Sequence, residues 1–172
     1  MLITGITHAS AREKKYAFRG LTEQGWREVE SAADRFKKLA GKDDPRITVI
    51  VASPKARCVE TAMLFSKAVR EFVSTSEMEL AVELKAGSVS GSELFDLSNM
   101  KQVKHLLVSA HADIVRALPV RVALIPEAAN GGWFSTRPVL FQLQYKVGDP
   151  WNSATINYCE GLLEGKWQRI IE

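Results

Sequence analysis

Two predominantly apolar runs constrain this fold more than any other feature of the sequence. ITVIVA (47–52) and HLLVS (105–109) lack the apolar–polar alternation expected of a strand with one face in water. Runs of this kind are typical of strands buried on both faces, as in a parallel sheet covered by helices on either side. We therefore expect an α/β protein.

Helical patterns follow the strands. In LTEQGWREVESAADRFKKLA (21–40), Thr22 is a candidate N-cap. After the strand at 47–52, Ser53 is a candidate N-cap followed by a proline at the first helical position. Further helices are expected from Glu93 and from about Asp113. The apolar residues expected to share one face of the first helix are Trp26, Val29, Ala33, Phe36 and Ala40.

The remaining strands complete one sheet. Strands are expected at 2–6 and 79–84, and an alternating segment at 139–147 and a further strand around 154–158 predict antiparallel neighbours or edges. Strands that alternate with helices favour a three-layer α/β/α sandwich with a mostly parallel sheet and an antiparallel edge. The length suits a single domain over 1–172, with no linker that divides it.

Composition argues against nucleic acid and membrane partners. The formal charge is +3, and no basic stripe with interleaved aromatic residues occurs. No apolar stretch approaches the roughly 20 residues of a membrane span, and the N-terminus lacks a secretory pattern. Only two cysteines occur, Cys58 and Cys159, which favours reduced thiols, with a disulfide as the alternative. We expect a cytoplasmic protein.

Polar residues follow several strands at the edge where open α/β sheets bind ligands. Thr7 and His8 end the first strand, and Arg57 lies one turn into the helix after the second. Glu83 ends the third strand, and His111 follows the fourth. Each residue alone has an ordinary structural explanation, such as a backbone hydrogen bond or a solvated helix surface. Their convergence on one edge indicates a functional site.

Other chemical motifs are absent from the sequence. It contains no Gly-Lys-Ser/Thr phosphate loop, no GxGxxG after the first strand and no GxSxG elbow. Cys58 has no arginine six residues later, so a cysteine-based phosphatase loop is not supported. His105 and His111 lack a third partner at metal-ligand spacing. We expect no metal and no cofactor, and a structural role for His105 at the start of its strand.

The ordered motifs resemble the histidine phosphatase superfamily, which has the phosphoglycerate mutase-like fold. The segments that carry the resemblance are ITHA (6–9), LTEQG (21–25), ASPKARCVETA (52–62), ELKAGSVSG (83–91) and LLVSAHADIVRAL (106–118). Fainter matches at NGG (130–132) and IN (156–157) extend the resemblance over nearly the whole chain, and ASPKARCVETA is the most specific segment. The family opens with Arg-His-Gly or Arg-His-Ala, so Thr7 stands where the family has an arginine.

The resemblance implies a metal-independent phosphatase that works through a phosphohistidine. It implies that His8 is the nucleophile and that Arg57 binds the non-bridging phosphate oxygens. It also implies that His111 donates a hydrogen bond to the phosphoryl group and that Glu83 protonates the leaving oxygen. A phosphatase fits better than a mutase, because the chain is short and has no large insertion. The implied substrate is a phosphorylated small molecule or a phosphoprotein, including phosphohistidine, handled by a monomer or a homodimer.

The departure at Thr7 leaves alternatives open. A charged hydrogen bond contributes roughly 1.5–3 kcal/mol, so its loss in the transition state costs on the order of tenfold to a hundredfold in rate. In one interpretation Arg12, or Thr7 itself, completes the phosphate site of a working enzyme. In another, the protein is a weak or inactive relative that binds an anion or a protein. A third is an unrelated α/β domain whose histidines bond the backbone.

Overall fold

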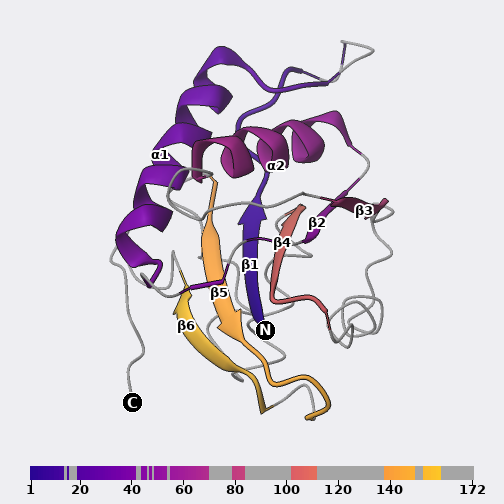
Figure 1. Ribbon diagram of the computed structural model, residues 1–172. Coiled ribbons are helices and arrows are strands. Elements are labelled where there is room, and N and C mark those ends of the chain that lie inside the picture. The colour runs from indigo at the N-terminus through magenta and orange to yellow at the C-terminus, as the bar shows by residue number, and fades with distance from the viewer. Residues whose placement is uncertain are drawn as a thin grey trace, which may run out of the picture.

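Six strands form one sheet in the order β3-β2-β4-β1-β5-β6 (Figure 1). The structure, a computed structural model, describes residues 1–13, 15, 19–41, 44–45, 47, 49–53, 55–69, 79–83, 102–111, 138–149 and 153–159, with the backbone alone at 79–83 and 159. The strands are β1 (Leu2–Thr7), β2 (Val49–Ala52), β3 (Glu79–Glu83), β4 (His105–Ala110), β5 (Leu140–Gln144) and β6 (Thr155–Cys159).

Four strands are parallel and the last two form an antiparallel edge. β1 pairs with β4 in parallel, from Leu2 opposite His105 to Thr7 opposite Ala110. β2 pairs in parallel with both β4 and β3. β5 runs antiparallel to β1, and β6 antiparallel to β5. The α/β class and the mostly parallel sheet with an antiparallel edge are therefore confirmed, and β1 lies near the centre of the sheet.

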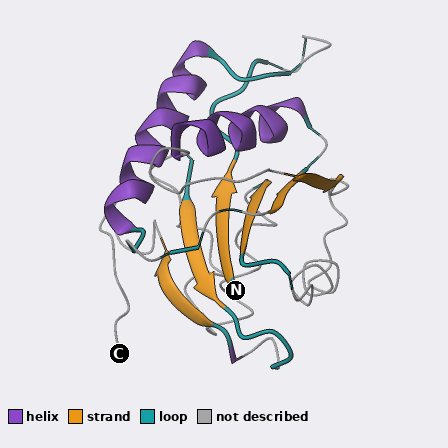
Figure 2. Cartoon of the chain, viewed as in Figure 1, coloured by secondary structure: helices purple, strands orange, loops and turns teal. Residues whose placement is uncertain are grey.

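The two described helices, α1 (Glu23–Leu39) and α2 (Ala56–Val69), cover the same face of the sheet (Figure 2). The helices expected from Glu93 and Asp113 lie outside the described residues. Alternate residues of the central strands point to the other face, and Ile3, Val51 and Leu106 on that face are fully buried. Burial on both faces is the property that the apolar runs predicted.

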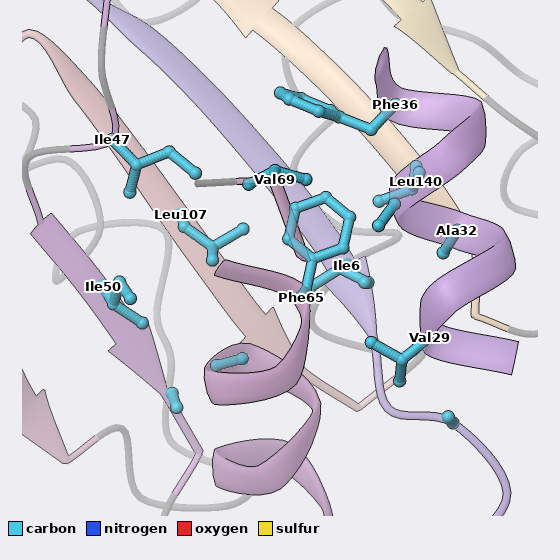
Figure 3. Packing of buried hydrophobic residues seen from close by; sticks show 14 of the residues in the cluster. Ile6, Val29, Ala32, Phe36, Ile47, Ile50, Phe65, Val69, Leu107 and Leu140 are labelled. Carbon is cyan, nitrogen blue, oxygen red and sulfur yellow. The ribbon is translucent and has the colours of Figure 1, made fainter. Parts of the chain in front are cut away.

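The core between the helices and the sheet is built around two aromatic side chains, Phe36 of α1 and Phe65 of α2. Their ring centroids are 5.4 Å apart at an interplanar angle of 74°. Such edge-to-face contacts contribute about 0.5–1.5 kcal/mol beyond the burial of area. Figure 3 shows these rings above Ile6 of β1, Leu107 of β4 and Leu140 of β5. This core holds both helices on the strands whose ends carry the site.

The expected N-cap of the first helix is confirmed, and one of its expected core residues is wrong. Thr22 Oγ1 accepts a hydrogen bond from the Gly25 amide at 3.0 Å. Trp26, however, is 52% exposed. The buried stripe starts instead at Gly25 and continues through Val29 and Ala33, because the first turn packs its glycine against the chain after β1. Val29, Ala33 and Phe36 are buried as expected, and only the first position of the stripe differs, with Gly25 in place of the neighbouring Trp26.

The expected N-cap at Ser53 is also wrong. α2 begins at Ala56, and the carbonyl of Lys55 accepts the first helical bond, from the Val59 amide. Ser53 still follows the sheet, since its amide donates to the carbonyl of Ser109 at 2.9 Å. Ser53 therefore continues the pairing with β4 and lies three residues before the first helical residue, Ala56. Its hydroxyl is therefore available to another partner.

Candidate active site

Backbone hydrogen bonds bring the residues that follow β1, β2 and β4 to one edge of the sheet. The His8 amide donates to the carbonyl of Ala110 at 3.1 Å, and the Ser53 amide donates to the carbonyl of Ser109. These bonds lie at the carboxyl ends of three parallel strands, where open α/β sheets bind ligands. His8, Ser53 and the neighbouring His111 are placed together by the register of the sheet.

The two histidines of this edge are in direct contact. The ring centroids of His8 and His111 are 5.1 Å apart, and the rings meet edge to face at 79°. His8 Nδ1 lies 2.8 Å from the carbonyl oxygen of Ala9. A carbonyl can only accept, so Nδ1 carries a proton and Nε2 of a neutral ring keeps its lone pair. The bond to the Ala9 carbonyl thus leaves Nε2 of His8 as the ring nitrogen with a lone pair.

Arg57, on the first turn of α2, contacts His111. One of its guanidinium nitrogens, Nη2, lies 3.4 Å from Nδ1 of His111. At the opposite side of the same ring, Nε2 of His111 lies 3.4 Å from Ser53 Oγ and 3.9 Å from Cys58 Sγ. Arg57 is half-buried, whereas Ser53 and Cys58 are fully buried. His111 is therefore clamped on both sides, beside a guanidinium that can bind an anion.

The chain that leaves His8 is tied to α2. The Ala9 amide donates to Thr61 Oγ1 at 3.2 Å, and the Thr61 hydroxyl donates to the carbonyl of Arg57 at 2.7 Å. Ala9 and Thr61 are both fully buried. The hydroxyl of Ser109 in β4 donates to the carbonyl of Cys58 at 2.8 Å, which fastens α2 to the sheet. The backbone next to His8 and that of Arg57 are thus connected by a short chain of hydrogen bonds.

Two carboxylates hold the next residues of this loop. Both the amide and the hydroxyl of Ser10 donate to Glu28 of α1, at 2.8 and 2.7 Å. The amide of Leu21 donates to Glu60 of α2 at 2.6 Å. Hydrogen bonds to charged groups are about twice as strong as neutral ones. The loop between β1 and α1 is accordingly fixed to both helices.

The other three predicted site residues have different surroundings. Glu83 ends β3 with its backbone opposite Ala52 of β2, and its side chain lies outside the described part of the structure. Thr7 is buried, and its Oγ1 accepts from the Val139 amide at 2.8 Å. Arg12 is exposed, and its amide donates to the carbonyl of Gly20. Among the described side chains, the structure brings together His8, Arg57 and His111.

Sequence reasoning missed two residues that contact His111, namely Ser53 and Cys58. Ser53 was interpreted as a helix cap, although its position directly after β2 also placed it at the ligand-binding edge. For Cys58 the sequence argues against a phosphatase nucleophile and favours a reduced thiol, and neither interpretation places it beside His111. Its place one residue after Arg57, on the first turn of α2, is the signal that could have found it.

The third histidine, His105, lies at the opposite end of β4 and is fully buried. Its Nδ1 donates to the carbonyl of Pro45 at 2.7 Å, so the Thr4 hydroxyl donates to Nε2 at 2.8 Å. Burial lowers the pKa of His105 from its usual value of 6.5, and the Pro45 bond opposes that shift. The ring is neutral and structural, away from the site.

Neither a cluster of metal ligands nor a membrane-spanning helix occurs in the described part of the chain. No group of three or more histidine, cysteine, aspartate or glutamate side chains could hold a metal ion there. No helix there combines the length and apolar character needed to cross a bilayer.

Comparison with solved structures identifies the fold. The protein histidine phosphatase SixA complexed with tungstate is 20% identical, with a TM-score of 0.68 over 94% of this chain and 97% of that one. The SixA protein of Agrobacterium tumefaciens is 22% identical, with a TM-score of 0.62 over 86% and 95%. A phosphoglycerate mutase from Plasmodium falciparum is 15% identical, with a TM-score of 0.53 over 90% and 88%.

No protein-family model matches the chain, and no curated protein does. The structural neighbours belong to the histidine phosphatase superfamily. This chain has their phosphoglycerate mutase-like fold.

Proposed function

We propose that this protein, which has the fold of the histidine phosphatase superfamily, is a metal-independent phosphatase that works through a phosphohistidine on His8. The observation that carries the proposal is the contact between His8, His111 and Arg57 at the carboxyl ends of the strands. It combines a nucleophilic nitrogen, a second imidazole and an anion-binding guanidinium in one place. Solved neighbours that are phosphatases support the same reaction class.

The proposed reaction has two steps. Nε2 of His8 attacks phosphorus, the bond to the ester oxygen breaks, and Glu83 gives that oxygen a proton. Arg57 and His111 stabilise the negative charge on the transferring phosphoryl group. A water molecule then gives a proton to Glu83 and attacks phosphorus, which releases inorganic phosphate and restores His8. The family resemblance is the reason for assigning the acid to Glu83, and the backbone of Glu83 beside Ala52, at the carboxyl end of β3, supports it.

A phosphohistidine-bearing protein is the first substrate to test, because a solved neighbour is a protein histidine phosphatase. Phosphorylated small molecules are the second class. We propose that the protein acts in the cytoplasm, as a monomer or a homodimer, and without nucleic acid.

A second function is favoured by the surroundings of Thr7. The hydroxyl oxygen of Thr7 binds the backbone of Val139, and Arg12 is exposed in the loop that follows. Thr7 carries no charge, and none of the described contacts brings the Arg12 side chain to Arg57 and the two histidines. A protein with this site could bind an anion or a phosphoprotein with little or no turnover.

One experiment distinguishes the two functions. The protein is mixed with a phosphohistidine-bearing protein and with p-nitrophenyl phosphate, without added metal, and an acid-labile, base-stable phosphohistidine is trapped from labelled substrate. A phosphatase gives the label on His8 and loses it in His8→Ala. Wild-type turnover by His8→Ala would refute the nucleophile. Phosphate binding by calorimetry with neither turnover nor label would establish the second function.

As a matched control, His105→Gln changes the third histidine, which lies at the other end of β4. We expect it to keep wild-type labelling.

A further inference from the structure

Nδ1 of His111 is the acceptor in its contact with Arg57. A guanidinium has donors only and stays charged in proteins, so the nitrogen 3.4 Å from Nη2 has its lone pair turned toward Arg57. In a neutral ring the proton is then on Nε2. This nitrogen faces Ser53 Oγ at 3.4 Å, and a hydroxyl oxygen can accept that proton in a hydrogen bond.

This arrangement is the wrong one for the proposed catalysis. To donate to a phosphoryl oxygen, the ring nitrogen beside Arg57 must carry a proton. When an anion binds Arg57, a lone pair on Nδ1 of His111 would face negative oxygen atoms. The free site therefore holds a tautomer of His111 that differs from the one needed when phosphate is bound.

The hydroxyl of Ser53 can serve both states, because it is both a donor and an acceptor. Ser53 is fully buried, and its amide bond to the carbonyl of Ser109 fixes its position beside the His111 ring. The second neighbour of Nε2, Cys58 Sγ at 3.9 Å, is a weaker hydrogen-bonding group. Ser53 is thus the better partner for either proton position.

We propose that Ser53 is a positioning residue whose hydroxyl reverses its hydrogen bond to His111 when phosphate binds Arg57. This inference rests on the proposed function and adds a step to it. In the free site Nε2–H of His111 donates to Ser53. With phosphate bound, one proton leaves Nε2 for water and another reaches Nδ1 from water, so the ring stays neutral. The Ser53 hydroxyl then donates to Nε2, and Nδ1–H donates to the phosphate.

Nitrogen-15 NMR of labelled histidine side chains tests this directly, with inorganic phosphate as the probe. Protonated and unprotonated ring nitrogens have well-separated shifts, and His111 is assigned from its absence in His111→Gln. We expect the Nε2–H form without phosphate and the Nδ1–H form at saturating phosphate. An Nδ1–H form in the free protein, an unchanged tautomer, or protons on both nitrogens with phosphate bound would each overturn the proposal.

Two serine variants separate positioning from packing. In Ser53→Ala the His111 ring loses its hydroxyl partner in both states, so we expect a mixture of the two tautomers with and without phosphate, in place of a complete reversal, and little change in phosphate affinity. Ser66→Ala also removes a fully buried hydroxyl, one that donates to the carbonyl of Met63 within α2. It should keep the reversal and the affinity. A complete reversal in Ser53→Ala would overturn the proposal.

If Ser53→Ala does not fold, Arg57→Ala tests the first half of the proposal. Without the guanidinium, the Nδ1–H form of His111 should appear in the free protein, and a pure Nε2–H form would overturn the assignment. The phosphohistidine trap keeps the two proposals distinct. Turnover with a fixed tautomer refutes only the role of Ser53, whereas reversal without phosphohistidine refutes only the phosphatase.

Discussion

Replacing Gly25 with alanine should damage both stability and the site, although alanine is the better helix former. A Cβ at this position would lie 2.2 Å from the carbonyl oxygen of Ser10 and 3.3 Å from Cβ of Leu21. The first contact is about 1 Å shorter than an ordinary carbon–oxygen contact. The obstacle is backbone, so no side-chain rotation relieves it, and either α1 or the loop after His8 must move.

The magnitude follows from three terms. Overpacking of this kind costs about 1–3 kcal/mol in the free energy of unfolding. Movement also weakens two bonds to the Ser10 carbonyl, from the amide of Thr22 at 3.0 Å and from its hydroxyl at 3.2 Å, at about 0.5–1.5 kcal/mol each. Helix propensity returns at most about 1 kcal/mol. We expect a net loss of about 1–5 kcal/mol, or a Tm lower by about 2–20 °C.

Urea unfolding and phosphatase assays on the same samples measure both effects. Because Ser10 is two residues after His8, we also expect kcat/KM to fall by about tenfold or more. Gly41→Ala is the matched control, since the nearest atom to its Cβ is Asp44 Oδ1 at 3.0 Å, the end of a flexible side chain. Wild-type stability and activity in Gly25→Ala would refute this reasoning.

Substitutions at three further positions test other parts of the structure. His105→Gln should flatten the pH dependence of Tm, because burial lowers the pKa of His105 in the folded protein. The stabilisation by neutral His105 is fully present above its unfolded pKa of about 6.5 and is lost as pH falls toward its folded pKa. An equal slope of Tm between pH 7.5 and 5.5 in both proteins would contradict this. Thr7→Arg should raise kcat/KM about tenfold to a hundredfold by adding a charged phosphate contact. Both Thr7→Arg and Thr7→Val should lower Tm, because the Val139 amide loses its acceptor. An unchanged kcat/KM in Thr7→Arg would mean that another group already supplies that contact. Arg57→Lys should lower kcat/KM at least tenfold, because an ammonium cannot bind two oxygens as a planar fork does; enzyme kinetics that match the wild type would exclude Arg57 from phosphate binding.

The parts of the fold that the sequence predicted well are those decided by local pattern. β2 and β4 contain consecutive apolar residues, β1 begins with an apolar pair, and the ends of β1 and β4 then locate His8 and His111 by the rule for parallel sheets. Thr22 was recognised as a cap because its side chain acts on an amide three residues away.

The parts that the sequence did not predict depend on distant segments. Glu28 and Glu60 bind amides 18 and 39 residues away, and nothing in their local pattern distinguishes them from ordinary helix-surface carboxylates. Ser53 has a local alternative, capping, that competes with its bond beside β4. Trp26 has the right spacing for the core, yet the close contact of Gly25 with Ser10 decides which side of α1 faces inward.

The closure of the loop after β1 has a consequence for engineering. A β-bridge joins Ala11 to Leu21, and the amide of Arg12 donates to the carbonyl of Gly20 at 3.0 Å. Residues 12 and 20 are therefore held together by the backbone. Glu28 binds the amide of Ser10, and Glu60 binds the amide of Leu21. Residues between 12 and 20 can be exchanged, by grafting or by randomised libraries, while the bonds of Ser10 and Leu21 keep the backbone that follows His8 in place.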